Sequence, residues 1–385
     1  MLAHGKARAV LVSGLILVAS VTLAAPSTNP WQQEQPLPIE LGTSGGNVND
    51  ISKAFCCSGT LGSLIQDNSG HQYILSNNHV LANTDTNANT GTAPIGDDVS
   101  QPGLVDVGCN ANSNNSHIVA HVSDWVPLGT HNTDAAIAGV VSGDVSNKIL
   151  GIGAVRNTTG TATVSEAVAK SGRTTQLTCA SVSSVDTTVK VQYQASCGAG
   201  KKFTILYTGQ VAVNSSSFSA GGDSGSLIVD QTSVEPVALL YAGSSSVTIA
   251  NPISDVLSGL SAVSSSSSTY SFVGTSNPTA VSCPTGGPPV GHGHGPTSRG
   301  SLQRAQNSKR AHEQQLLADP AIIGVGVGAN SEDPSEAVVL IYVEQGRPVG
   351  EIPVELDGVR TEVVRTEAFR AYGWNESDLN RCLVQ

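Results

Sequence analysis

Short runs of Val, Ile, Leu and Thr alternate with clusters of Gly, Asn, Ser and Asp between about residues 41 and 261. Runs such as TVKVQYQ and KKFTILYTGQVAV come close to a period of two, which is typical of strands that bury one face. Helical periodicity is nearly absent there, apart from a short stretch around residues 253–260. The pattern therefore predicts an all-β sandwich or barrel domain over residues 41–261.

The pattern changes twice after residue 261. Residues 262–297 hold serine runs followed by Gly and Pro, which cannot bury enough apolar area to offset ordering, so we expect a linker. From residue 298 on, SLQRAQNSKRAHEQQLLADP is a good helix candidate, and three strand-like runs follow it, AIIGVGVGA, AVVLIYVEQ and IPVELDGVRTEVVRT. Residues 298–385 are therefore predicted to form a small α+β domain, and we expect the β domain to work without it.

The first residues have the pattern of a secretory signal. Lys6 and Arg8 precede an apolar run from about residue 9 to 24, which ends in the small-residue sequence TLA. The alternative is a retained membrane anchor, but the run is shorter than the ~20 residues that a spanning helix usually needs. We therefore expect a signal peptide at residues 1–24, a secreted or periplasmic protein, and no membrane anchor after cleavage.

Cysteine content and charge narrow the function classes. Seven cysteines fit an oxidising compartment, and their odd number leaves at least one unpaired or intermolecular. Their spacing matches no zinc pattern, so neither a metal nor another cofactor is expected. The formal net charge of −11 has no basic stripe, which argues against a nucleic-acid partner. No oligomeric state follows from the sequence.

One disulfide is predicted between Cys179 and Cys197, because the residues between them read as a turn and a strand that could fold back on its neighbour. Cys283 offers another arrangement. If it bridges back to the β domain, the first half of the linker is tied down and the boundary moves towards Gly286.

Three sequence stretches could carry nucleophilic chemistry. Ser224 follows Asp223 in a glycine-rich turn, GGDSGSLIV, His79 ends an apolar run in ILSNNHV, and Asp134 begins one in HNTDAAIAGV. A serine hydroxyl is a weak nucleophile unless a base takes its proton, and a carboxylate that holds the base improves it. The order His, Asp, Ser is that of chymotrypsin-like enzymes.

Each of these residues also has a purely structural interpretation. His79 could be a packed histidine at a strand end, Asp134 a turn former and Ser224 a turn serine, although all three would have to coincide. Asp124 in VSDWVPLG competes for the role of orienting carboxylate, and Asp134 is preferred because it begins the apolar run. An α/β-hydrolase is a poorer fit, since GDSGS lacks the GxSxG pattern and the histidine precedes the serine.

Residues from about 59 to 257 resemble a chymotrypsin-fold (trypsin-like) serine peptidase. The resemblance rests on GTLGSLI, SNNHV, TDAAIA, GGDSGSLIV and VALLYAGSSSVTIANPISDVL. These motifs most resemble those of bacterial relatives of the plant narrow-leaf type peptidases. It implies a double β-barrel with Ser224 as nucleophile, His79 as general base and then acid, and Asp134 as the group that orients the imidazole. The N–H groups of Gly222 and Ser224 would form the oxyanion hole.

The resemblance implies an exported serine endopeptidase that cleaves protein or peptide substrates through an acyl-enzyme. The alternative is a catalytically silent binding module of the same fold. In digestive members of the family a freshly cut N-terminus pairs with the aspartate before the nucleophile, but no basic cleavage site followed by Ile-Val is present here. Internal N–H donors or polar side chains could satisfy Asp223 instead.

Phe218 stands six residues before Ser224, where trypsin-like selection would call for an aspartate. Selection of substrates with Arg or Lys at the cleavage site is therefore not supported, and we expect the specificity pocket to accept a small or apolar substrate side chain.

Overall fold

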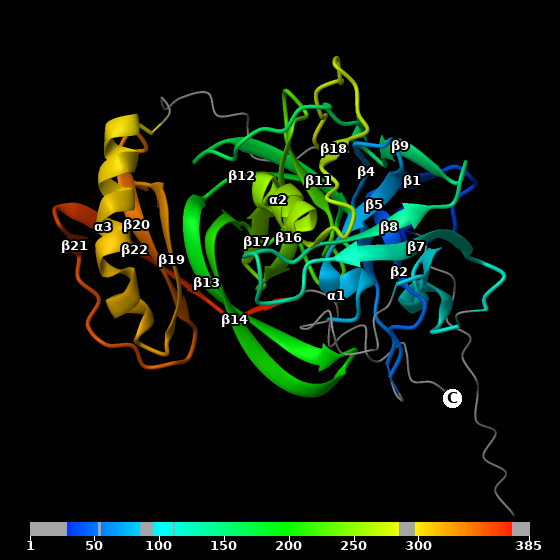
Figure 1. Ribbon diagram of the computed structural model, residues 1–385. Helices are drawn as coiled ribbons and strands as arrows, with labels where there is room; N and C mark the ends of the chain where they lie inside the picture. The colour runs from blue at the N-terminus through cyan, green and yellow to red at the C-terminus, as the bar shows by residue number, and fades with distance from the viewer. Residues whose placement is uncertain (1–28, 53–54, 85–94, 111, 285–296, 372–385) are drawn as a thin grey trace, which may run out of the picture.

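The computed structural model describes residues 29–52, 55–84, 95–110, 112–284 and 297–371. Figure 1 shows a mostly β molecule in which the first strands curl into one sheet and the later strands form a second. The first sheet has the strand order β18-β4-β5-β8-β7-β6-β2-β3. Its strands are β2 (Thr43–Asn47), β3 (Gly59–Leu61), β4 (Ser63–Asp67), β5 (Gln72–Ser76), β6 (Asp98–Gln101), β7 (His117–Trp125), β8 (Ala136–Val140) and β18 (Tyr270–Phe272).

The second sheet has the order β12-β11-β15-β16-β17-β14-β13-β19-β20-β22-β21, with β23 paired to both β13 and β16. Its strands are β11 (Ala167–Gly172), β12 (Gln176–Ser181), β13 (Ser184–Ser196), β14 (Ala199–Asn214), β15 (Leu227–Asp230), β16 (Pro236–Gly243), β17 (Val247–Pro252), β19 (Ile322–Ala329), β20 (Ala337–Glu344), β21 (Glu355–Leu356), β22 (Val359–Thr366) and β23 (Phe369–Ala371). The remaining elements are β1 (Ile39–Leu41), β9 (Val145–Ile149), β10 (Gly153–Ala154), α1 (Asn78–Leu81), α2 (Ile253–Val263), α3 (Arg299–Leu317), and the 3₁₀ helices η1 (Pro30–Gln32) and η2 (Leu104–Val107).

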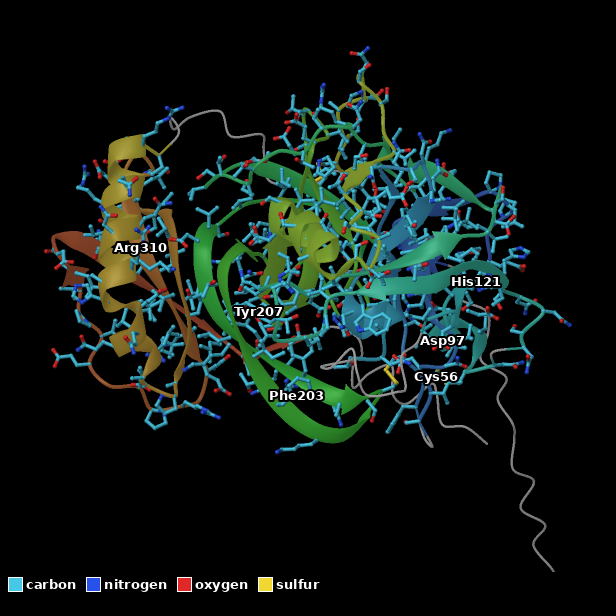
Figure 2. The ribbon with its side chains drawn as sticks, in the orientation of Figure 1. Cys56, Asp97, His121, Phe203, Tyr207 and Arg310 are labelled. Carbon is cyan, nitrogen blue, oxygen red and sulfur yellow. A yellow bond between two sulfur atoms is a disulfide. The ribbon has the colours of Figure 1, made fainter. Side chains whose placement is uncertain are left out.

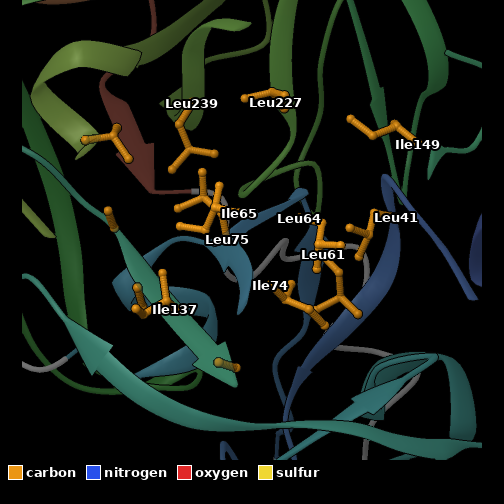
Figure 3. Close-up of a cluster of buried hydrophobic side chains, with 14 of the residues drawn as sticks. Leu41, Leu61, Leu64, Ile65, Ile74, Leu75, Ile137, Ile149, Leu227 and Leu239 are labelled. Atoms are coloured by element: carbon orange, nitrogen blue, oxygen red, sulfur yellow. The ribbon is translucent and has the colours of Figure 1, made fainter. Parts of the chain in front are cut away.

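The two sheets share one hydrophobic core. Leu61, Ile65 and Ile137 of the first sheet pack in the same cluster as Leu227 and Leu239 of the second (Figure 3). Each such side chain contributes about 1.5–3 kcal/mol when it is removed from water. The loops at the seam between the sheets are therefore held by packing from both sides, and the predicted double-barrel fold class is confirmed.

The alternation of apolar and polar residues in TVKVQYQ determines which face of β13 is buried. Val189, Val191 and Tyr193 are all buried, as expected when every second residue of a strand faces the core. β13 and β14 form a long hairpin that lies between the first sheet and the C-terminal part of the chain, and Phe203 and Tyr207 mark the β14 side (Figure 2).

The C-terminal strands continue the second sheet. β19 pairs antiparallel with β13, and a Cβ at Gly326 would lie 2.5 Å from the Thr187 side chain, so a glycine is needed for this close approach. Helix α3 covers β19 and β20, and the Ser298 hydroxyl caps it by accepting the N–H of Ser301. The predicted helix and three strands are thus present, whereas a division into separable domains stays a prediction.

Part of the predicted linker is structured. β18 pairs antiparallel with β4 in the first sheet, and Val281 belongs to the shared core. The predicted signal peptide at residues 1–24 lies outside the described residues. Within the described part of the chain, no helix is long and apolar enough to cross a membrane.

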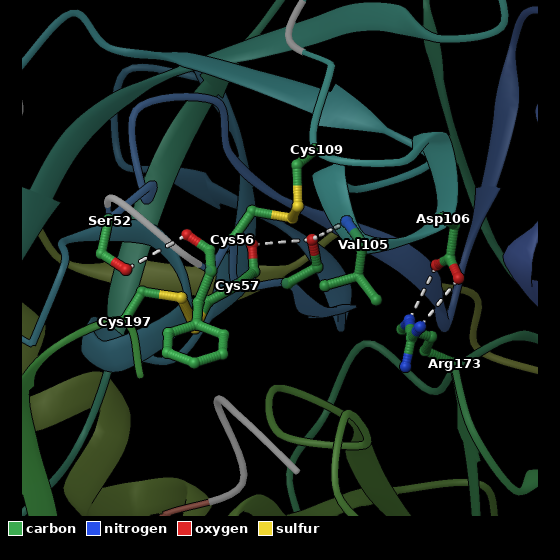
Figure 4. The surroundings of a disulfide bond; sticks show 10 residues. Ser52, Cys56, Cys57, Val105, Asp106, Cys109, Arg173 and Cys197 are labelled. Atoms are coloured by element: carbon green, nitrogen blue, oxygen red, sulfur yellow. Dashed lines mark hydrogen bonds and ion pairs between the residues drawn. A yellow bond between two sulfur atoms is a disulfide. The ribbon is translucent and has the colours of Figure 1, made fainter. Parts of the chain in front are cut away.

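The disulfide prediction is wrong in its pairing. The structure joins Cys56 to Cys109, Cys57 to Cys197 and Cys179 to Cys283 (Figure 4 shows the first two). β12, which carries Cys179, pairs with β11, whereas β13 pairs with β14, so the two segments do not fold back on each other. The Cys283 bridge ties the first half of the predicted linker to the second sheet. Three disulfides fit an oxidising compartment, and Cys382 lies outside the described residues.

Candidate active site

The first sheet brings His79 and Asp134 together. His79 lies in α1 directly after β5, and Asp134 directly precedes β8, the antiparallel neighbour of β5. The pair Ser76↔Ala136 aligns these two strand ends, so the residues just beyond them meet. The His79 Nδ1 atom lies 2.6 Å from the Asp134 Oδ2 atom, and both side chains are buried. The sequence-predicted contact is therefore present.

Asp134 has further hydrogen-bond partners. The Tyr193 hydroxyl donates to Asp134 Oδ2 at 2.9 Å and lies 2.9 Å from the Tyr207 hydroxyl. Burial, aided by the charge of Asp134, raises the pKa of both tyrosines well above 10, so they remain donors. The Asp134 N–H in turn donates to Asn251 Oδ1 at 3.0 Å. His79 and Tyr193 thus hold the carboxylate, and Asn251 fixes the Asp134 backbone.

Sequence reasoning missed Tyr193 and Tyr207. The period of two in β13 placed Tyr193 on the buried face, but only the long hairpin carries it back to Asp134. The rival carboxylate, Asp124, lies in β7 and accepts the N–H of Trp125. Burial raises the Asp124 pKa to about 6. Asp134, not Asp124, contacts the His79 ring.

The turn before Ser224 orients the first of two backbone donors. The Gly221 carbonyl accepts the Thr174 hydroxyl at 2.6 Å, and the C=O and N–H of a trans peptide point in opposite directions. The Gly222 N–H therefore points away from Thr174. Gly222 has φ +94°, and a Cβ there would lie 2.5 Å from Thr174 Oγ1, so this position requires glycine.

The second donor is the N–H of Ser224. The Asp223 carbonyl accepts both the N–H of Ser226, at 3.0 Å, and its hydroxyl, at 2.6 Å. These two bonds fix the peptide group that joins Asp223 to Ser224, so the Ser224 N–H points away from Ser226. Among the described residues, neither the Gly222 nor the Ser224 N–H has a hydrogen-bond acceptor. Within the described part of the chain, both N–H groups of the serine turn are therefore unpaired.

Asp223 is satisfied inside its own sheet. Its carboxylate accepts the N–H groups of Thr174 and Ala220, at 2.8 and 3.0 Å, and the hydroxyl of Thr175 at 2.7 Å. The Lys170 Nζ atom lies 3.4 Å away, and both charged side chains are completely buried. Burial lowers the Lys170 pKa, and the Asp223 charge opposes that shift. The expected internal donors are present, and Lys170 adds a cation that the sequence did not indicate.

Ser224 and His79 approach the seam from opposite sheets. The Ser224 carbonyl accepts the N–H of Thr60 at 2.8 Å, and Gly59 packs between that carbonyl and Val80. The Ser224 Oγ and His79 Nε2 atoms are both buried, and neither has a partner in the described part of the chain. Buried polar atoms normally have a partner. Catalytic hydrogen bonds are often long without substrate and tighten when it binds.

The site is closed in this structure. His79, Asp50, Tyr193 and Ala371 line a cavity of about 10 Å³, roughly the room of one water molecule. Burial raises the pKa of Asp50 to about 7, and the nearby His79 works against this shift. The neighbouring sulfur atoms of Cys57 and Cys197 are bonded to each other, so they are not available as metal ligands.

Phe218 lies in the core of the second sheet. Its side chain is completely buried among apolar residues, and its carbonyl accepts the Thr178 hydroxyl at 2.7 Å. The expectation of a small or apolar substrate side chain stays a prediction.

No protein-family model and no curated protein matches the sequence. Solved structures that are similar include a glutamic acid specific serine protease, with 17% identity and a TM-score of 0.40 over 61% of this chain and 100% of that one. Protease A of Thermobifida fusca has 17% identity and a TM-score of 0.38 over 62% and 99% of the two chains. The chymotrypsin of Cellulomonas bogoriensis has 14% identity and a TM-score of 0.38 over 62% and 99%.

Proposed function

We propose that this protein is an exported serine endopeptidase in which Ser224, His79 and Asp134 act as a catalytic triad. The observation that carries the proposal is the buried His79–Asp134 pair of one sheet, beside which Gly59 and Thr60 hold the Ser224 turn of the other. The geometry suits acyl transfer because a base, its orienting carboxylate and a hydroxyl come from the ends of separate strands and meet at one seam.

The reaction begins with proton transfer. His79 Nε2 removes the proton of the Ser224 hydroxyl while Oγ attacks the carbonyl carbon of the scissile peptide bond. The resulting imidazolium then gives that proton to the leaving amine as the C–N bond breaks, which leaves an acyl-enzyme on Ser224. A water molecule, deprotonated by His79, attacks the ester and releases the acid, so the serine and the neutral imidazole are regenerated.

The surrounding residues stabilise charge as it develops. Asp134 accepts a hydrogen bond from the Nδ1–H group of His79 and so keeps Nε2 free as the base, and it favours the imidazolium that forms. Tyr193 donates to the same carboxylate oxygen and restrains its position. The unpaired N–H groups of Gly222 and Ser224 supply the two donors that an oxyanion needs.

The test is covalent labelling with a fluorophosphonate probe, followed by mass mapping of the modified peptide. We expect the label on Ser224 and its loss in Ser224→Ala. Ser217→Ala is the matched control, since Ser217 lies exposed in the same segment, and it should label as the unmodified protein does. If folded protein in which β23 has been released took no label at Ser224, the peptidase proposal would be wrong and the silent binding module would stand.

A further inference from the structure

One edge of β16 changes partner beside the Ser224 turn. Leu239 of β16 pairs with Leu227, the first residue of β15. Beyond Leu239 that edge has no further β15 residue to pair with, and Ala242 and Gly243 pair with β23 instead. Unpaired strand edges present rows of N–H and C=O groups that bind extended peptides. This edge of β16 therefore has the form of a peptide-binding edge.

β23 comes from the far end of the described chain. It pairs antiparallel with β16 in the register Ala242↔Ala371 and Gly243↔Arg370. On its other side it pairs parallel with β13, with Val191↔Phe369. The strand is thus inserted between β16 and the long hairpin, and backbone groups hold it on both sides.

Side chains fix the same segment. The Thr366 hydroxyl contacts the Ser244 hydroxyl at 2.5 Å, and Glu367 accepts the Ser245 hydroxyl at 2.6 Å. Phe369 is completely buried, and its ring meets the Tyr342 ring edge-on with centroids 5.7 Å apart. Residues 366–371 are therefore bound along β16 and the turn that follows it.

The direction of β23 relates it to the candidate nucleophile. The Leu240 carbonyl accepts the N–H of Gly225, the residue after Ser224, so β16 leaves the nucleophile turn at Leu240. Because β23 is antiparallel to β16, it runs towards this turn as it goes from Phe369 to Ala371. Ala371 also lines the small cavity that contains His79. The segment thus lies where an extended substrate would approach Ser224.

We propose that residues 366–371 of this chain occupy the edge of β16 at residues 241–243 as an intramolecular inhibitor. The inhibitory part rests on the proposed peptidase function. Main-chain pairing supplies the affinity, and the covalent tether keeps the segment at a high effective concentration, so a substrate strand must displace it. The closed cavity at His79 is the expected state while β23 is in place.

The first test weakens the strand pairing. Proline lacks the N–H that a ladder uses, so Arg370→Pro and Ala371→Pro should each release β23 from its two neighbours. Val354→Pro is the matched control, because Val354 is 80% exposed in the same C-terminal region. We expect fluorophosphonate labelling of Ser224 at least tenfold faster in both β23 variants, and at the unmodified rate in the control. Folded β23 variants that label no faster than the unmodified protein would overturn the inhibitory part of the inference.

A disulfide variant provides a test that does not depend on whether the proline variants fold. Gly243 and Arg370 are directly paired, so their side chains share one face, and cysteines at both positions can be bridged. The oxidised Gly243→Cys/Arg370→Cys protein should label at least tenfold more slowly than either single variant under the same conditions. Equal rates for the bridged protein and the single variants would show that β23 does not block the site.

A binding measurement separates this inference from the proposed chemistry. In the Ser224→Ala background, a fluorescent peptide with the sequence TEAFRA, residues 366–371, should bind when Arg370→Pro is also present. It should bind at least tenfold more weakly when β23 is intact, and a scrambled peptide should not bind. Because no reaction is needed, binding here together with no labelling at Ser224 would reject the peptidase function and keep the peptide edge. No difference between the two backgrounds would reject the edge as the site of residues 366–371.

Discussion

The two sheets each place a completely buried aspartate near the seam, and the two carboxylates are neutralised differently. Asp134 of the first sheet contacts the His79 ring and accepts a hydrogen bond from Tyr193, which lies in the β13–β14 hairpin of the second sheet. Asp223 of the second sheet is paired with Lys170 and bound by donors of its own sheet. Under the proposed function, Asp134 acts on the reacting groups through His79, whereas the contacts of Asp223 are confined to the serine turn and its own sheet.

Replacing Asp134 should have the largest effect, and that effect should be on turnover. In Asp134→Asn the amide no longer holds His79 in the tautomer that leaves Nε2 free, and turnover should fall by about 10⁴, as in the general template for this triad. Asp124→Asn is the matched control, because Asp124 contacts Trp125 and not His79. Turnover of a small ester would be compared in protein with β23 released. An equal loss in both variants would show that Asp134 has no special role.

Removing the cation of the second pair should act on stability instead. In Lys170→Met, Asp223 is left charged and buried without its partner, which typically costs about 3–5 kcal/mol of unfolding free energy. Lys148→Met, at an exposed position, should have little effect. Urea unfolding measures both. A Lys170→Met protein as stable as the unmodified one would mean that the other hydrogen-bond donors to Asp223 suffice.

Asp50 is a third buried aspartate, in addition to Asp134 and Asp223, and burial has the largest effect on its pKa. Its pKa rises from 3.8 to about 7, so the folded state keeps a proton that the unfolded chain has lost. The free energy of unfolding should therefore fall as pH rises from about 4 to about 7, by up to about 4 kcal/mol for this group. Asp50→Asn should remove that part of the pH dependence, which urea unfolding at pH 4, 5.5 and 7.5 would measure. Parallel curves for both proteins would contradict it.

The local motifs predicted the residues that come from strand ends. His79 follows an apolar strand, Asp134 precedes another, and Ser224 follows paired glycines, so each is fixed by neighbours within a few residues. The residues that were missed, Tyr193, Tyr207 and Lys170, lie in strands. The sequence shows which face of such a strand is buried, but not which residues of other strands that face will meet. The Cys179–Cys197 prediction was wrong for the same reason, since it assumed that sequence neighbours pair.

The printed residues alone predict the period of the strands, the glycines that the serine turn requires, and the order of His79, Asp134 and Ser224. These depend on side-chain alternation and local backbone conformation, which nearby residues control. Only the tertiary structure decided that Cys197 bonds to Cys57, that Tyr193 reaches Asp134, and that β23 returns to pair with β16. Backbone hydrogen bonds between strands are chemically alike at every position. Which strand meets which is therefore set by packing across the whole fold and not by the residues of either strand.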